Sequence, residues 1–128
     1  MSTRAQIVVE GLEEIKLYRH SDGYPEGVLP VLEPFVQDFL QKKGWDPEYL
    51  LARMVAALVV AGDDLEGTLG YGLSPEWAPD IEYWYRVRRN GKIECWKTLQ
   101  GWWEASYVRG FRPEEHSRRL RGKLQQIR

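Results

Sequence analysis

The chain has 128 residues, of which 43% are hydrophobic and 29% are charged, and its formal net charge is −1. These values are typical of one globular domain and exclude an intrinsically disordered chain, which combines few aromatic residues with a high net charge. A single cysteine, Cys95, excludes an internal disulfide framework, and the chain shows neither a signal-peptide core nor a stretch apolar enough to span a bilayer, so we expect a cytoplasmic protein without membrane contact.

The N-terminal part of the chain carries two short patterns in which apolar and polar residues alternate. They cover residues 3–9 and 13–19, and Gly11 lies in the turn between them. Alternation of this kind is typical of half-buried strands, so we predict an antiparallel hairpin here. Its second strand leads into residues 20–27, a run of turn-forming residues.

Two helices are predicted next, near residues 30–43 and 46–61, because apolar residues recur there at helical spacing. Pro30 and Pro34 lead us to expect that the regular part of the first helix begins between them. The sequence Asp46-Pro47-Glu48 predicts the start of the second helix, since it supplies a capping side chain, a proline at the first helical position and an acid beside the positive helix end.

Residues 62–80 are rich in glycine and proline, and within this loop we predict one short strand at 68–73. The clearest hairpin covers residues 81–97. A three-residue loop, with Gly91 at a positive φ angle, sets its register so that Val87 pairs with Ile93. One face of this hairpin is then formed by Ile81, Tyr83, Tyr85, Val87, Ile93 and Cys95, and the other by Glu82, Trp84, Arg86, Glu94 and Trp96.

The C-terminal part of the chain is rich in tryptophan and then in basic residues. We expect residues 99–108 to pack over Trp84 and Trp96, which would otherwise form a stacking platform for a flat ligand. Residues 109–128 contain seven basic and two acidic residues, a charge of +5 that leaves −6 for residues 1–108.

The predicted fold is of the α+β class, in two layers. An antiparallel sheet of four or five strands packs against two helices, and a tryptophan-rich C-terminal extension ends in a basic helix. Residues 1–108 form the single α+β domain in this prediction, and residues 109–128 form the basic C-terminal helix or tail.

The loop of residues 20–27 is the strongest candidate for a functional site. It places an imidazole, two carboxylates and a phenol close together at the end of a strand, where a rigid scaffold can hold a binding loop. With three residues from later segments, it makes up the predicted ligand-binding set: His20, Asp22, Tyr24, Glu26, Tyr71, Asp80 and Glu82. The alternative interpretation is a tight turn, in which Asp22 bonds to the backbone and Tyr24 lies on the core.

Three segments of the chain also resemble a protein family. They are Leu17-Tyr18-Arg19-His20-Ser21-Asp22-Gly23-Tyr24-Pro25-Glu26-Gly27, Gly70-Tyr71-Gly72 and Asp80-Ile81-Glu82-Tyr83. Together they look like a family of small uncharacterised proteins of bacteria and their phages, with a His-x-Asp-Gly-Tyr-Pro-Glu-Gly motif. The resemblance covers roughly residues 1–97. It implies a phage-derived protein and carries no mechanism.

These features lead us to expect a small non-enzymatic binding or regulatory protein that binds a ligand or protein partner through the 20–27 loop, with no cofactor and no metal. One alternative is an enzyme acting on a nucleotide or phosphate ester, with a metal held by His20, Asp22 and carboxylates such as Asp63 and Asp64. A second alternative is a nucleic-acid-binding protein whose tail contacts phosphates through Arg118, Arg119, Arg121 and Lys123. A homo-oligomer is compatible with each of these functions.

Overall fold

The computed structural model describes residues 3–62, 67, 69–98 and 105–109 of the chain. In chain order the elements are β1 (Ala5–Val9), β2 (Lys16–Arg19), α1 (Pro25–Lys43), α2 (Pro47–Ala61), β3 (Tyr71–Ser74), β4 (Tyr83–Val87), β5 (Ile93–Thr98) and β6 (Ala105–Arg109). This combination of strands and helices confirms the predicted α+β class. The predicted basic helix lies outside the described residues, apart from Arg109 at its beginning.

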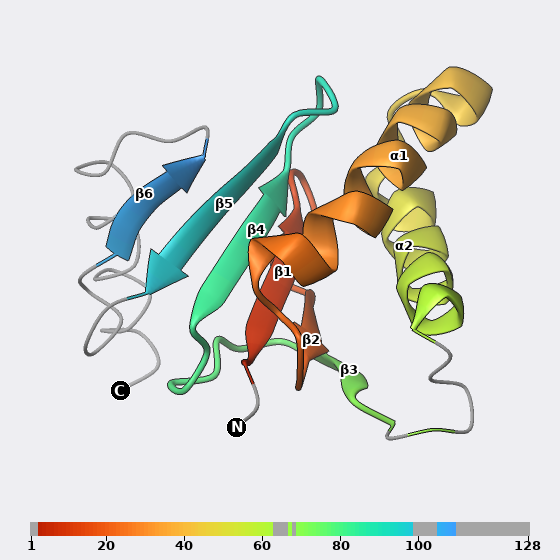
Figure 1. Cartoon of the computed structure of the whole chain (residues 1–128). Coiled ribbons are helices and arrows are strands. Elements are labelled where there is room, and N and C mark those ends of the chain that lie inside the picture. Colours follow the sequence, from red (N-terminus) through yellow and green to blue (C-terminus); the bar gives the residue numbers. More distant parts are fainter. Residues whose placement is uncertain (1–2, 63–66, 68, 99–104, 110–128) are drawn as a thin grey trace.

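The described strands form a six-stranded sheet in the order β3-β2-β1-β4-β5-β6 (Figure 1). β1 and β2 form the predicted N-terminal hairpin, and β4 and β5 form the second one. The two hairpins meet through β1 and β4, which run parallel with Val9 opposite Val87. The sheet is therefore mixed, and the prediction of a purely antiparallel sheet was wrong in the direction of this one pairing. Residues 75–82 return the chain from the end of β3 to the end of the sheet where β1 begins, so β4 enters in the same direction as β1.

Both helices lie on the same face of the sheet (Figure 1). α2 begins as predicted, because Asp46 accepts a backbone hydrogen bond at 3.4 Å and Pro47 occupies the first position. α1 begins at Pro25, and Pro30 and Pro34 lie inside it. The expected start between the two later prolines was wrong, because Pro25 already supplies a first residue that needs no N–H group. Among the described residues, no helix combines the length and the apolar composition needed to cross a membrane.

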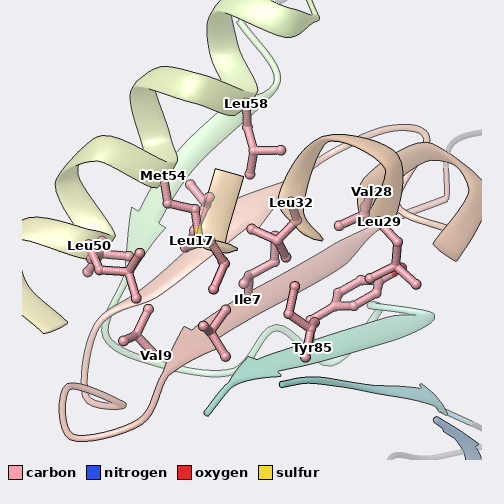
Figure 2. Close-up of a cluster of buried hydrophobic side chains, with 14 of the residues drawn as sticks. Ile7, Val9, Leu17, Val28, Leu29, Leu32, Leu50, Met54, Leu58 and Tyr85 are labelled. Carbon is pink, nitrogen blue, oxygen red and sulfur yellow. The ribbon is translucent and has the colours of Figure 1, made fainter. Parts of the chain in front are cut away.

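The larger core cluster fills the space between the helices and the sheet. Figure 2 shows Ile7 and Tyr85 on the strands facing Leu32 and Met54 on the helices. Complete burial of a side chain of this size contributes about 1.5–3 kcal/mol. The remaining labelled members of the cluster are Val9, Leu17, Val28, Leu29, Leu50 and Leu58. This cluster anchors α1, and thereby the loop that precedes it.

The β4–β5 hairpin has the predicted register. Val87 lies opposite Ile93, and Gly91 in the loop has a φ angle of 88°, a conformation that glycine adopts without strain. The predicted three-residue loop is therefore confirmed. Ile81 departs from the predicted face, because β4 begins only at Tyr83 and Ile81 packs with tryptophans on the opposite side of the sheet.

A second, smaller cluster lies on the face of the sheet away from the helices. Its buried members are Val8, Trp77, Ile81, Trp84 and Trp96. Trp77 packs edge-on against Trp84, with ring centroids 4.9 Å apart. Gln6 holds the backbone around Trp77 in place. Its side-chain amide nitrogen donates to the Glu76 carbonyl at 3.0 Å, and its side-chain oxygen accepts from the Ala78 N–H at 2.8 Å.

Burial of the hairpin tryptophans contradicts the alternative of an exposed stacking platform. Trp84 and Trp96 are at most 1% exposed. Trp77, which we did not assign to this face from the sequence, supplies part of the cover. Of the predicted cover, Trp102 and Trp103 lie outside the described residues. Residues 105–108, which we also expected to pack over the tryptophans, instead belong to β6, which pairs with β5 at the edge of the sheet.

Candidate functional site

The loop of residues 20–27 leads directly from a strand into a helix. β2 ends at Arg19, Tyr24 is the last residue before the helix and has an extended backbone, and α1 begins at Pro25. Glu26 lies in the first turn, where a carboxylate interacts favourably with the positive end of the helix dipole. The Tyr-Pro-Glu part of the motif is therefore a helix start.

Two glycines let this loop pack closely. The N–H of Gly23 donates to the Thr3 carbonyl at 2.9 Å, and its own carbonyl accepts the Tyr85 hydroxyl at 2.5 Å. Burial raises the pKa of Tyr85, so this hydroxyl remains a donor. A Cβ atom on Gly23 would lie 2.6 Å from a side chain of β1, and one on Gly27 would collide with the Asp22 carbonyl. A tight turn accounts for both glycines, but the expectation that Tyr24 lies on the core was wrong, because its side chain is exposed.

Arg19 fixes the loop from the end of β2. Its Nε donates to the Ser21 carbonyl at 2.8 Å, and its guanidinium donates to the Gly27 carbonyl at 3.3 Å. The same guanidinium lies 5.5 Å from the ring centre of Tyr71. The backbone N–H of His20 donates to the carbonyl of the residue before β3 at 2.8 Å. Tyr71 is half-buried and supports the loop through Arg19.

The segment before β4 reaches the same end of the sheet. Asp80 forms an ion pair with Arg4 at 3.4 Å, and the N–H of Glu82 donates to the Arg4 carbonyl at 2.8 Å. Thr3, the preceding residue, accepts the hydrogen bond from Gly23. The 20–27 loop, the start of β3 and the 80–82 segment are thus brought together where β1 begins.

Six of the predicted site residues are exposed at this end, and we call them the polar rim: His20, Asp22, Tyr24, Glu26, Asp80 and Glu82. His20 Nδ1 lies 3.1 Å from the Tyr18 hydroxyl, and the Tyr24 hydroxyl donates to the Asp22 carboxylate at 3.2 Å. This hydrogen bond raises the pKa of Tyr24. Asp22 has a φ angle of 55°, a left-handed conformation that Asp tolerates better than most residues. The rim therefore presents four carboxylates, one imidazole and one phenol.

The polar rim does not form a metal centre among the residues that the structure describes. None of the described residues belongs to a group of three or more His, Cys, Asp or Glu side chains able to hold an ion. Asp63 and Asp64 lie outside the described residues. The same is true of the predicted phosphate-contacting residues, Arg118, Arg119, Arg121 and Lys123. Cys95 is buried in the helix-facing cluster, which is unsuited to a nucleophile.

Arg4 and Arg19 position the rim, and we did not predict this role for either residue. In the sequence each is a basic residue near one end of a predicted strand, a pattern typical of a solvated sheet edge. The contact of Arg4 with the later 80–82 segment depends on the parallel pairing of β1 with β4. No local signal in the sequence indicates this pairing.

Comparison with models of protein families, with curated proteins and with solved structures found no match for the chain. The resemblance of the 20–27 motif to bacterial and phage proteins therefore stays a prediction.

Proposed function

We propose that the protein is a small non-enzymatic binding protein that recognises a basic segment of a partner protein through the polar rim. The observation that carries this proposal is the contrast between the fixed backbone of the rim and its exposed side chains. Hydrogen bonds to Thr3, Arg4 and Gly70 hold the backbone, while the six side chains face solvent. A preorganised surface loses little conformational entropy on binding, so more of its interaction energy appears as affinity.

The chemistry of the rim favours a basic partner. Four of its six side chains are carboxylates, which attract lysine and arginine side chains of a partner. The range of this attraction shortens as the salt concentration rises. Tyr24 adds an aromatic ring that is 36% exposed, and tyrosine is enriched at the energetic centres of protein interfaces. The rim thus combines charge for attraction with one ring for contact.

Binding fits the hydrogen bonds of the rim better than catalysis does. They join His20 to Tyr18 and Tyr24 to Asp22. Nucleophilic catalysis typically requires a base bonded to a hydroxyl or thiol nucleophile, with a third group orienting the base. The described rim residues show no such chain of three groups. A cytoplasmic setting and a phage origin complete the proposal, supported by the buried thiol of Cys95 and by the family resemblance.

The proposal is tested by comparing partner capture by the wild-type protein and a rim variant carrying His20→Ala, Asp22→Ala, Tyr24→Ala and Glu26→Ala. Both proteins are immobilised and exposed to a lysate of the native host, and captured proteins are quantified by mass spectrometry at low and high salt. We expect a partner with a basic segment to be retained by the wild type, lost from the rim variant, and released at high salt.

A matched control carries Asp38→Ala and Lys42→Ala, which remove an exposed ion pair of 2.9 Å on α1. This control leaves the rim intact, so it should capture the same partners as the wild type. Circular dichroism of the three proteins checks that the fold is unchanged. Identical capture by the wild type and the rim variant would contradict the proposal.

A further inference from the structure

Most carboxylates of the polar rim are exposed without an ion pair. Only Asp80 forms one, whereas in the described part of the chain no basic side chain pairs with Asp22, Glu26 or Glu82. The hydrogen bond from the Tyr24 hydroxyl to Asp22 raises the pKa of that hydroxyl, and the charges of Asp22 and Glu26 add to the effect. Both carboxylates therefore lie near the exposed phenol, and three negative charges of the rim are open to a cationic segment.

The chain carries a segment of the opposite charge. Residues 110–128, which lie outside the described residues and which we call the basic segment, contain six lysine or arginine side chains against Glu114 and Glu115, a charge of +4. Four of the six basic side chains are clustered, at Arg118, Arg119, Arg121 and Lys123. Complementary charge favours contact between two surfaces. The chemistry that suits the rim is thus present in the same chain.

The basic segment can reach the rim from the end of β6. β6 runs parallel to β4, because both are antiparallel to β5, so it ends at Arg109, at the end of the sheet away from the rim (Figure 1). Four strand spacings and the length of β6 separate Arg109 from the rim beside β2, a direct distance of roughly 26 Å. An extended chain spans about 30 Å from Arg109 to Arg118 and about 46 Å to Lys123. The clustered basic side chains therefore lie within reach.

We propose that the basic segment docks on the polar rim of its own chain and competes there with the basic segment of a partner protein. This inference rests on the proposed function of the rim and adds its regulation. A tethered segment acts at an effective concentration of about 1 mM, so an affinity of only about 0.1 mM would keep the rim occupied in roughly nine molecules of ten. A partner then binds about tenfold more weakly than it would to a free rim.

The first test compares the full-length wild type with a tail variant that carries Arg118→Gln, Arg119→Gln, Arg121→Gln and Lys123→Gln. NMR spectra of the ¹⁵N-labelled proteins report the backbone amides of the rim. We expect these resonances to differ between the two proteins at low salt and to coincide at high salt, because salt screens the contact. High salt alone should move the rim resonances of the wild type toward those of the tail variant, so the test does not depend on the variant.

A charge-matched control carries Lys42→Gln, Arg53→Gln, Arg89→Gln and Lys92→Gln, which remove four positive charges from exposed positions elsewhere in the chain. Its rim resonances should match those of the wild type. The difference between the wild type and the tail variant should also be independent of protein concentration. A difference that disappears on dilution would overturn the intramolecular contact and would assign the basic segment to the rim of a second copy.

The second test titrates a synthetic peptide of residues 110–128 into the same full-length proteins by calorimetry. We expect the tail variant to bind it about tenfold more tightly than the wild type, whose own segment competes. A variant that combines the tail substitutions with the four rim substitutions should not bind it.

The inference and the proposed function fail in different ways. Absence of peptide binding to the tail variant, or equal rim resonances and equal peptide affinities in the wild type and the tail variant, would overturn the inference and leave the proposed function untouched. Identical partner capture by the wild type and the rim variant would instead contradict the proposed function, and the inference with it.

Discussion

The two faces of the sheet bury their side chains by different means. The face beneath α1 and α2 is covered by apolar helix residues (Figure 2). The opposite face also buries polar and charged side chains, since Gln6, Lys16, Arg86 and Glu94 are each at most 5% exposed. A buried charge is costly unless it is paired and hydrogen-bonded. The second face therefore depends on ion pairs and hydrogen bonds, whereas the first depends on close packing of apolar side chains.

Ion pairs connect the arginines and glutamates of the second face, whereas the ammonium of Lys16 donates to two backbone carbonyls. Arg86 pairs with Glu13 at 3.1 Å, and Arg88 bridges Glu10 and Glu94, each at 3.2 Å. Glu10 also accepts a backbone N–H from the hairpin loop at 2.8 Å, and this hydrogen bond lowers its pKa. The two faces should therefore respond differently to truncation, to loss of charge and to pH.

The largest effect is expected on the helix-covered face. Leu32 is fully buried in its cluster, so Leu32→Ala removes apolar contacts and leaves a cavity. We expect the free energy of unfolding to fall by about 2–5 kcal/mol, independently of salt. Urea denaturation followed by circular dichroism measures the change. A loss of less than about 1 kcal/mol would mean that the helices add little to the stability of the sheet.

On the opposite face, loss of one charge should have a smaller effect. Arg86→Ala leaves Glu13 without its partner, but that carboxylate is 26% exposed and water can hydrate it in part. We expect a loss of about 2 kcal/mol, below the usual cost of breaking a fully buried pair. Arg53→Ala, which removes the same charge from the exposed side of α2, is the matched control and should change the unfolding free energy by no more than about 0.5 kcal/mol. Equal effects of the two substitutions would show that pairing on the second face is unimportant.

Local signals predicted the helix-covered face better than its opposite. The register of β4 with β5 followed from alternation and from one glycine, Gly91, and the start of α2 followed from Asp46-Pro47. The parallel pairing of β1 with β4 joins residues far apart in the sequence, and no turn signals it. The cover provided by Trp77 depends on the same long-range arrangement.

The candidate site shows the same division. The polar loop was recognisable because its residue types are unusual at the end of a strand, and its segments do meet in the fold. The roles of Arg4 and Arg19 depend on contacts between strands that sequence patterns do not specify. The helix start at Pro25 was missed because Pro30 and Pro34 were interpreted as barriers to the helix that contains them.

The smallest effect is expected from the titration of Glu94. Burial raises the pKa of its carboxyl above the usual value of about 4.5, in spite of the neighbouring Arg88. The folded protein therefore holds this proton more tightly than the unfolded chain does, and between the two pKa values this group makes stability fall as pH rises. Glu94→Gln removes this contribution, so the variant should gain stability relative to the wild type as pH rises above about 4.5. Urea midpoints measured across this range report the difference.

Glu10 provides the opposite case for the same measurement. Its pKa is lowered, so its contribution is fully present above about 4.5 and is lost as pH falls through the folded pKa. Glu10→Gln should therefore lose stability relative to the wild type as pH rises through this lower window. If both variants instead follow the wild type in parallel at every pH, the charged network does not distinguish the two carboxylates. The second face would then be stabilised by its tryptophans and by Gln6, in the same manner as the apolar face.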